Sequence, residues 1–194
     1  MDVDSHRFPN LCLMKLSAHH KKMGDVVEWY DGRKHYDMVY MSRVFTDTYS
    51  KDYAGTVHAD TVIKGGTGYG YDNFLLDEVE HIYPDYSLYP SFAGTAYGFL
   101  SRGCPRGCKF CIVGEKEGLQ SKAVADLSEF WRGEKEIKLL DPNLLACKDW
   151  ERLLKQLIES RATVDFTQGL DIRLITPEIV DILNRVNTKM LHFA

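Results

Sequence analysis

The carboxyl-terminal half of the chain alternates short apolar runs with helical patterns, and this alternation restricts the fold more than any other feature. Residues 150–158 place Trp150, Leu153, Leu154 and Leu157 on one helix face. Strands are expected at 97–100, 137–140, 164–167 and 190–193, and helices at 121–131, 150–158 and 177–186. Such a strand–helix alternation predicts a parallel sheet with right-handed crossovers.

The amino-terminal part predicts a smaller α/β unit. A helix is expected from Pro9 to Gly24, because Pro near the start and bases followed by Gly at the end are typical helix boundaries. Short strands are expected at 26–29, 38–40 and 62–63. An open sheet of this class usually begins with a strand, and only residues 1–4 precede the helix. The first strand is therefore either very short or missing.

Three segments follow from these patterns. Residues 1–70 form the small open α/β domain, and residues 71–95, rich in Tyr, Gly and Pro, form a linker with at most one short helix near 75–81. Residues 96–194 form the second domain. The chain ends inside an apolar strand, so we expect it to be part of a longer polypeptide.

Composition excludes several classes of protein. No apolar run approaches the roughly 20 residues of a membrane span, and the amino terminus lacks a basic n-region and an apolar h-region. We therefore expect a cytoplasmic protein that has no membrane partner. The net charge is −4 and no clustered basic excess is present, so a nucleic-acid partner is not indicated.

The cysteines carry the strongest chemical signal. Their number, five, is odd, and with the cytoplasmic setting this argues against a disulfide framework. Cys104, Cys108 and Cys111 form a C-x3-C-x2-C triplet directly after the first strand of the second domain. Three thiolates suit Zn²⁺ or an iron–sulfur cluster. A structural zinc site normally has four protein ligands, whereas a triplet leaves an open coordination position, which points to catalysis.

The triplet, with aromatic Phe110 before its last cysteine, resembles the signature of the radical S-adenosylmethionine (SAM) superfamily. The resemblance covers residues 96–194 and implies the first half of a radical SAM (β/α) partial barrel. It implies that Cys104, Cys108 and Cys111 hold a [4Fe-4S] cluster whose fourth iron chelates SAM. It also implies reductive cleavage of SAM to a 5′-deoxyadenosyl radical, with Phe110 beside the adenine.

The same resemblance suggests further residues that contact SAM or the substrate. After the second strand, Asp141 and Asn143 stand where the family has acceptors for the SAM amino group, or they form a turn that caps a helix. After the third strand, Gln168, Asp171 and Arg173 lie at the ligand-binding edge of the expected sheet. Arg173 would hold the SAM carboxylate, or would instead form a salt bridge with Asp171.

The first domain resembles the flavodoxin-like cobalamin-binding domain that precedes the barrel in one radical SAM branch. The resemblance rests on Asp4-Ser5-His6, Ser42-Arg43-Val44 and Gly65-Gly66, which occur in the family's order. Pro9 replaces a glycine of the family pattern and Val44 replaces a leucine. Cobalamin is thus a possible cofactor, and vestigial or altered use of the domain is the favoured expectation.

Together these features predict a radical SAM enzyme, or a fragment of one, that uses a flavodoxin- or ferredoxin-type electron donor on an unknown substrate. Its catalytic residues beyond the cofactor site are not identified, and the family's barrel core needs about twice the length of residues 96–194. The alternative is a non-catalytic module that binds zinc or an iron–sulfur cluster and is completed by a ligand from a partner chain.

Overall fold

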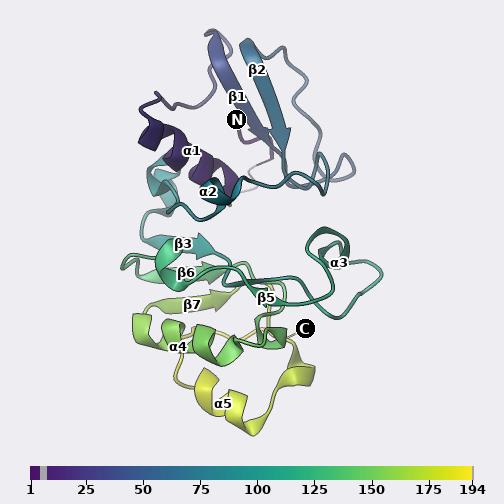
Figure 1. Cartoon of the computed structure of the whole chain (residues 1–194), viewed down its shortest axis with the longest axis vertical. Helices are drawn as coiled ribbons and strands as arrows, with labels where there is room; N and C mark the ends of the chain where they lie inside the picture. The colour runs from purple at the N-terminus through teal and green to yellow at the C-terminus, as the bar shows by residue number, and fades with distance from the viewer. Residues whose placement is uncertain (5–7, 194) are drawn as a thin grey trace. The chain divides into compact units, whose positions relative to one another are not determined.

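The computed structural model describes residues 1–4 and 8–193, and the chain divides into two compact units, Met1–Phe92 and Ala93–Ala194 (Figure 1). The described residues form a mixed α/β structure. The helices are α1 (Leu11–Met23), α2 (Asp77–Glu80), α3 (Val113–Lys116), α4 (Trp150–Ser160) and α5 (Pro177–Leu183). The strands are β1 (Tyr36–Ser42), β2 (Ala59–Gly65), β3 (Thr95–Gly98), β4 (Ser101–Arg102), β5 (Lys122–Ala123), β6 (Glu136–Leu139) and β7 (Thr163–Phe166). None of the helices in these ranges has the length and apolar character needed to cross a membrane.

The first unit is built on the parallel pair β1 and β2, which are in register with Val39 opposite Val62. Asp2 forms a single parallel bridge to Ser42 on the other side of β1, and no strand precedes α1 in the described residues. Helix α1 begins after Asn10, whose side chain accepts a hydrogen bond from Leu13 N (3.2 Å) and donates one to Ser42 Oγ (2.8 Å). It ends at Gly24 in the left-handed conformation, as the sequence predicts.

The strand expected at 26–29 is wrong. Residues 25–31 have no ladder partner, and the side chain of Val26 is almost fully exposed. Trp29 lies edge-on to Tyr89, with ring centroids 5.3 Å apart, and its indole Nε1 donates to Leu88 O (3.3 Å). Trp29, one of the residues that suggested a strand, therefore packs through its side chain on residues 88–89 and not in a sheet.

The second unit contains the expected parallel sheet, in the order β3-β6-β7 (Figure 1). Two of the expected helices, α4 and α5, are present, and α4 buries Leu153, Leu154 and Leu157 completely. Thr176 caps α5 through its side-chain oxygen, which accepts from Ile179 N (3.3 Å). The helical spacing and the cap in the sequence thus predicted these elements correctly.

Two other expected elements of this unit are wrong. Residues 121–131 are not a helix, because Lys122–Ala123 pairs with β4 and only a 3-10 turn, Leu127–Glu129, follows. That turn is closed by a capping box between Asp126 and Glu129. At 190–193, a single bridge from Leu170 to Phe193 replaces the expected strand.

Candidate cofactor site at the cysteine loop

The loop that carries the three cysteines is closed at its base by the antiparallel pair β4–β5. Gly103 has a φ of +87°, and a Cβ at this position would meet Gln120 O at 2.2 Å, so only glycine allows the two arms to approach this closely. Cys104 N donates to Gly118 O (3.2 Å) just inside the base. This hydrogen bond and the close approach at Gly103 therefore fix the backbone position of Cys104.

Glu117 joins the two arms of the loop and was not singled out from the sequence. Its carboxylate accepts from Gly103 N (3.1 Å) and from Arg102 Nη1 (3.3 Å). The Arg102 guanidinium also lies over the Phe99 ring, 3.9 Å from its centroid. A lone glutamate fifteen positions away in sequence gives no pattern that would have identified this contact.

The thiol-bearing part of the loop is open to solvent. Cys104 and Cys108 are half-buried, Cys111 is exposed, and Phe110 is 91% exposed. Cys111 N donates to Cys108 O (2.9 Å), so the last two cysteines share one turn. Within residues 1–4 and 8–193, no three Cys, His, Asp or Glu side chains converge closely enough to hold a metal ion. The three thiols are therefore not gathered around one point in the described residues.

Asn143 lies beside the first cysteine, after the end of β6. Its Nδ2 donates to Cys104 Sγ (3.5 Å) and to Asp171 Oδ2 (3.2 Å). Its Oδ1 is buried and has no hydrogen-bond partner in the described structure. Because a buried acceptor without a donor is unfavourable, this oxygen is suited to receive a donor from a ligand.

Asp141, two residues earlier, is turned toward the chain itself. Its carboxylate accepts from Leu100 N (3.0 Å), Ser101 N and Ser101 Oγ (2.6 Å), which fixes the segment between β3 and the cysteine loop. Burial raises the pKa of Asp141 to about 6, and the hydrogen bonds from Ser101 and Leu100 limit that rise. Both oxygens are engaged, so Asp141 supports the loop while Asn143 offers the free acceptor.

Asp171, after β7, brings two arginines to the loop. Its buried carboxylate accepts from Arg106 Nε, in the cysteine loop, and from Arg173 Nε (2.7 Å) and Nη2 (3.3 Å). Burial acts to raise the pKa of Asp171, but the hydrogen bonds from Arg173 and Arg106 outweigh it and hold the pKa below its ordinary value. The salt bridge between Asp171 and Arg173, which was the alternative to a contact of Arg173 with the SAM carboxylate, is present.

Arg173 also interacts electrostatically with the cysteines. Its pKa is raised, chiefly by the hydrogen bond to Asp171 and further by Cys108 and Cys104. Its side chain is more than half exposed. Gln168, in the turn after β7, is exposed and is not part of this hydrogen-bonded group. The structure thus brings together Cys104, Asn143, Asp171, Arg173 and Arg106.

The residues present fit a three-cysteine iron–sulfur cluster with an added ligand in two respects. The donors are soft thiols on one glycine-containing loop, flanked by guanidinium groups that complement an anionic cluster. The buried, unpaired Asn143 Oδ1 beside Cys104 offers an acceptor for a ligand amino group.

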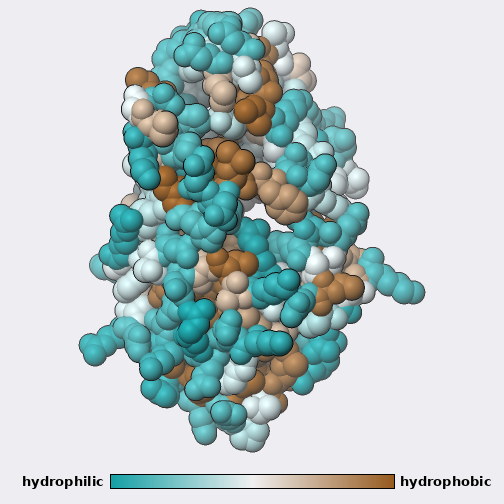
Figure 2. Space-filling model, in the orientation of Figure 1, coloured by the Kyte–Doolittle hydropathy of each residue, from teal (hydrophilic) through white to brown (hydrophobic). Residues whose placement is uncertain are grey.

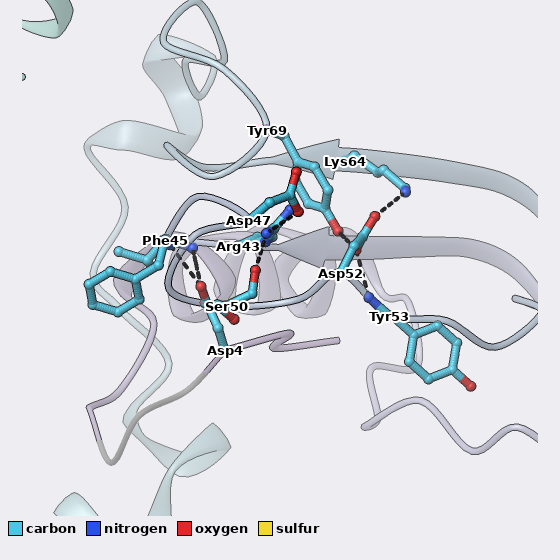
Figure 3. Close-up of polar contacts among 10 residues, drawn as sticks. Asp4, Arg43, Phe45, Asp47, Ser50, Asp52, Tyr53, Lys64 and Tyr69 are labelled. Carbon is cyan, nitrogen blue, oxygen red and sulfur yellow. Dashed lines mark hydrogen bonds and ion pairs between the residues drawn. The ribbon is translucent and has the colours of Figure 1, made fainter.

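Polar contacts within the chain gather near the carboxyl ends of β1 and β2, the edge at which cobalamin binds in the domain that the sequence resembles (Figure 3). Cβ atoms at Gly66 and Gly68 would meet Arg43 O at 2.3 Å and Phe45 O at 2.4 Å. Asp4 accepts from Val44 N (2.9 Å) and Phe45 N (2.7 Å), which holds this backbone in place. The two glycines therefore accommodate neighbouring backbone, which leaves no room over them for a corrin face.

Arg43 and Tyr69 complete this packing. The buried Arg43 donates to Asp47 and Ser50, and its guanidinium lies 5.7 Å from the centroid of the Tyr69 ring. The Tyr69 hydroxyl donates to Asp52 (Figure 3). Ser5 and His6, which also belong to the cobalamin pattern, lie outside the described residues. The described residues of this pattern therefore do not fit cobalamin.

The chain matches no protein-family model, no curated protein and no solved structure.

Proposed function

We propose that the chain belongs to the radical SAM superfamily and binds a [4Fe-4S] cluster through Cys104, Cys108 and Cys111. The parallel order β3-β6-β7 then corresponds to the first part of a partial barrel, and the β1–β2 unit to a reduced flavodoxin-like domain. Support comes from the place of the triplet, on the loop after β3, where the carboxyl ends of β6 and β7 also contribute side chains.

The observation that carries the proposal concerns the Asn143 side chain, which donates from Nδ2 to Cys104 Sγ while its buried Oδ1 has no hydrogen-bond partner in the described structure. In this assignment Asn143 accepts a hydrogen bond from the SAM ammonium group, and Arg173 faces the SAM carboxylate. Asp171 holds both arginines in place, and Arg106 lies between two of the cysteines. When bound, the cluster supplies the electron for reductive cleavage of SAM, and a flavodoxin- or ferredoxin-type protein would deliver it.

Anaerobic reconstitution with iron and sulfide tests the proposal. The reconstituted protein should be brown, contain about four irons per chain and show a reduced-cluster EPR signal that changes when SAM is added. With dithionite, 5′-deoxyadenosine should form. A colourless protein that binds one zinc, or a cluster signal that does not respond to SAM, would contradict the proposal and favour a non-catalytic metal module.

Single alanine variants locate the ligands. Cys108→Ala should lower the iron and sulfide content strongly, because the thiolate is the ligand. Cys147→Ala is the matched control, since Cys147 is buried in the region between β6 and α4 and makes no contact with the loop that the structure records. Full iron content in Cys108→Ala, or equal loss in both variants, would contradict the ligand assignment.

A further inference from the structure

The outer edge of β2 is an open sheet edge. β1 pairs with one side of β2, and within the part of the chain that the structure describes no strand pairs with the other. Residues 60–64 of β2 are all exposed, including Val62 (40%) and Ile63 (41%). Figure 2 shows apolar atoms at the surface over this strand.

An edge of this kind favours association. Parallel strands are normally covered on both faces, and two strands alone bury little apolar surface. The free edge also presents unpaired backbone N–H and C=O groups, which form a template for another strand. Proteins usually block such an edge with a bulge, a proline, a charged side chain or a covering element. Residues 59–65 contain no proline, and their two charged residues, Asp60 and Lys64, have opposite signs.

The sequence of β2, Ala-Asp-Thr-Val-Ile-Lys-Gly, is complementary to itself when it is reversed. In an antiparallel pair centred on Val62, each Asp60 lies opposite the Lys64 of the other copy. Thr61 then lies opposite Ile63, which pairs two β-branched side chains. A two-fold axis normal to the sheet leaves each side chain on its own face of the sheet. Residues directly opposite each other in an antiparallel pair share a face, so the axis must pass through a residue and not between two residues. Centring on Thr61 or Ile63 instead places a charged residue opposite Val62.

We infer that β2 pairs antiparallel with β2 of a second copy of this chain, with Val62 on the two-fold axis. The two β1–β2 pairs then form one four-stranded sheet. Two symmetric Asp60–Lys64 ion pairs fix the register and Val62 packs against its counterpart. The inference is independent of the cysteine loop and of the proposed function.

The present partners of these charges do not prevent the pairing. Asp60 Oδ1 lies 2.8 Å from His35 Nε2, and both side chains are more than 60% exposed. Lys64 Nζ donates to Asp52 Oδ2 (2.9 Å) and retains further N–H donors for Asp60 of the second copy. Exposed ion pairs contribute little, so exchanging or extending them is inexpensive compared with forming a new strand pair.

Charge reversal tests the inference on the full chain by light scattering after gel filtration over a dilution series from roughly 100 µM downward, which gives the dissociation constant of each variant. The unmodified chain should have twice the chain mass. Asp60→Lys and Lys64→Asp should each weaken the dimer about tenfold or more, because each places like charges opposite one another twice. The double variant should dimerise again.

Mixing the single variants separates the interface from a folding defect. Asp60→Lys carries two lysines at these positions and Lys64→Asp carries two aspartates, so the two variants in an equimolar mixture should form a heterodimer that is tighter than the homodimer of either variant. Asp37→Lys, an exposed reversal on β1, is the matched control and should remain dimeric. A monomeric unmodified chain, single variants that dimerise as tightly as the unmodified chain, or a double variant and mixture that associate no better than the single variants would each overturn the inference.

Discussion

The Arg106 guanidinium, between the first two cysteines, donates to the buried carboxylate of Asp171, which lies 65 residues later in the chain. This contact joins the cysteine loop to the carboxyl end of β7. It also places Asp171 among three donors, because Arg173 and Asn143 bond to the same carboxylate. Asp171 is therefore a positioning residue for the groups around the cysteine loop.

Replacing Asp171 with alanine should lower the free energy of unfolding by about 1–3 kcal/mol, because Arg106 and the Asn143 amide lose a buried acceptor. Chemical denaturation at pH 7 measures the change. Asp181→Ala, at an exposed acid of α5, should change it by less than about 0.5 kcal/mol. Equal effects of the two substitutions would show that the Asp171 contacts do not support the loop.

Alanine at Gly103 should disrupt the base of the cysteine loop, because its Cβ would meet Gln120 O at 2.2 Å. We expect a loss of at least about 2 kcal/mol in stability and a reduced iron content after reconstitution. Gly118 is the matched control, since it also has positive φ (+91°) but nothing within 4 Å of a Cβ. Gly118→Ala should cost only about 1 kcal/mol. Similar losses at both positions would contradict the close approach at Gly103.

Asp141 should make stability decrease as pH rises from about 4 to 6. Burial raises its folded pKa to about 6, above the ordinary value of 3.8, so folding takes up a proton between these two values. The stabilisation is complete below the unfolded pKa and is lost as pH passes the folded pKa, by about 2–3 kcal/mol. Asp141→Asn cannot ionise. Urea titrations of both proteins from pH 4 to 7 should therefore have different slopes, and parallel curves would contradict the raised pKa.

Asp52 should act in the opposite direction at lower pH. The Tyr69 hydroxyl and Lys64 lower the folded pKa of Asp52 to about 2 from 3.8. Its contribution to stability is present above the unfolded pKa and is lost as pH falls toward 2. Asp52→Asn should remove this part of the acid sensitivity in urea titrations between pH 5 and 2. Asp72→Asn, an exposed acid, should retain it, and an unchanged acid profile in Asp52→Asn would refute the assignment.

Local patterns predicted the elements whose contacts are local. Leu153, Leu154 and Leu157 lie on one face of α4 and are buried there, and Asp171 bonds to Arg173 two residues away. Both relations follow from spacing alone. The parallel order of β3, β6 and β7 follows in turn from the strand–helix alternation.

The errors arise where distant pairing overrides local preference. Leu127 and Phe130 have helical spacing and are both buried, yet Lys122 pairs with Arg102 and Val124 N donates to Leu100 O. Residues 121–131 therefore turn back along the cysteine loop before a helix can form. The contact between Arg106 and Asp171 was also missed, because no sequence interval connects an arginine in a loop to one aspartate among many.

The short pair β4–β5 has a consequence for the loop's conformational entropy. It brings Arg102 and Lys122 together before any ligand arrives, so the cost of closing the intervening segment is already included in folding. A cofactor that gathers the three thiols needs to order only the residues beyond this closure. A substitution that breaks the β4–β5 pairing would therefore weaken cofactor binding although all three cysteines remain. The reason is that the loop without cofactor would have more conformational entropy to lose on binding.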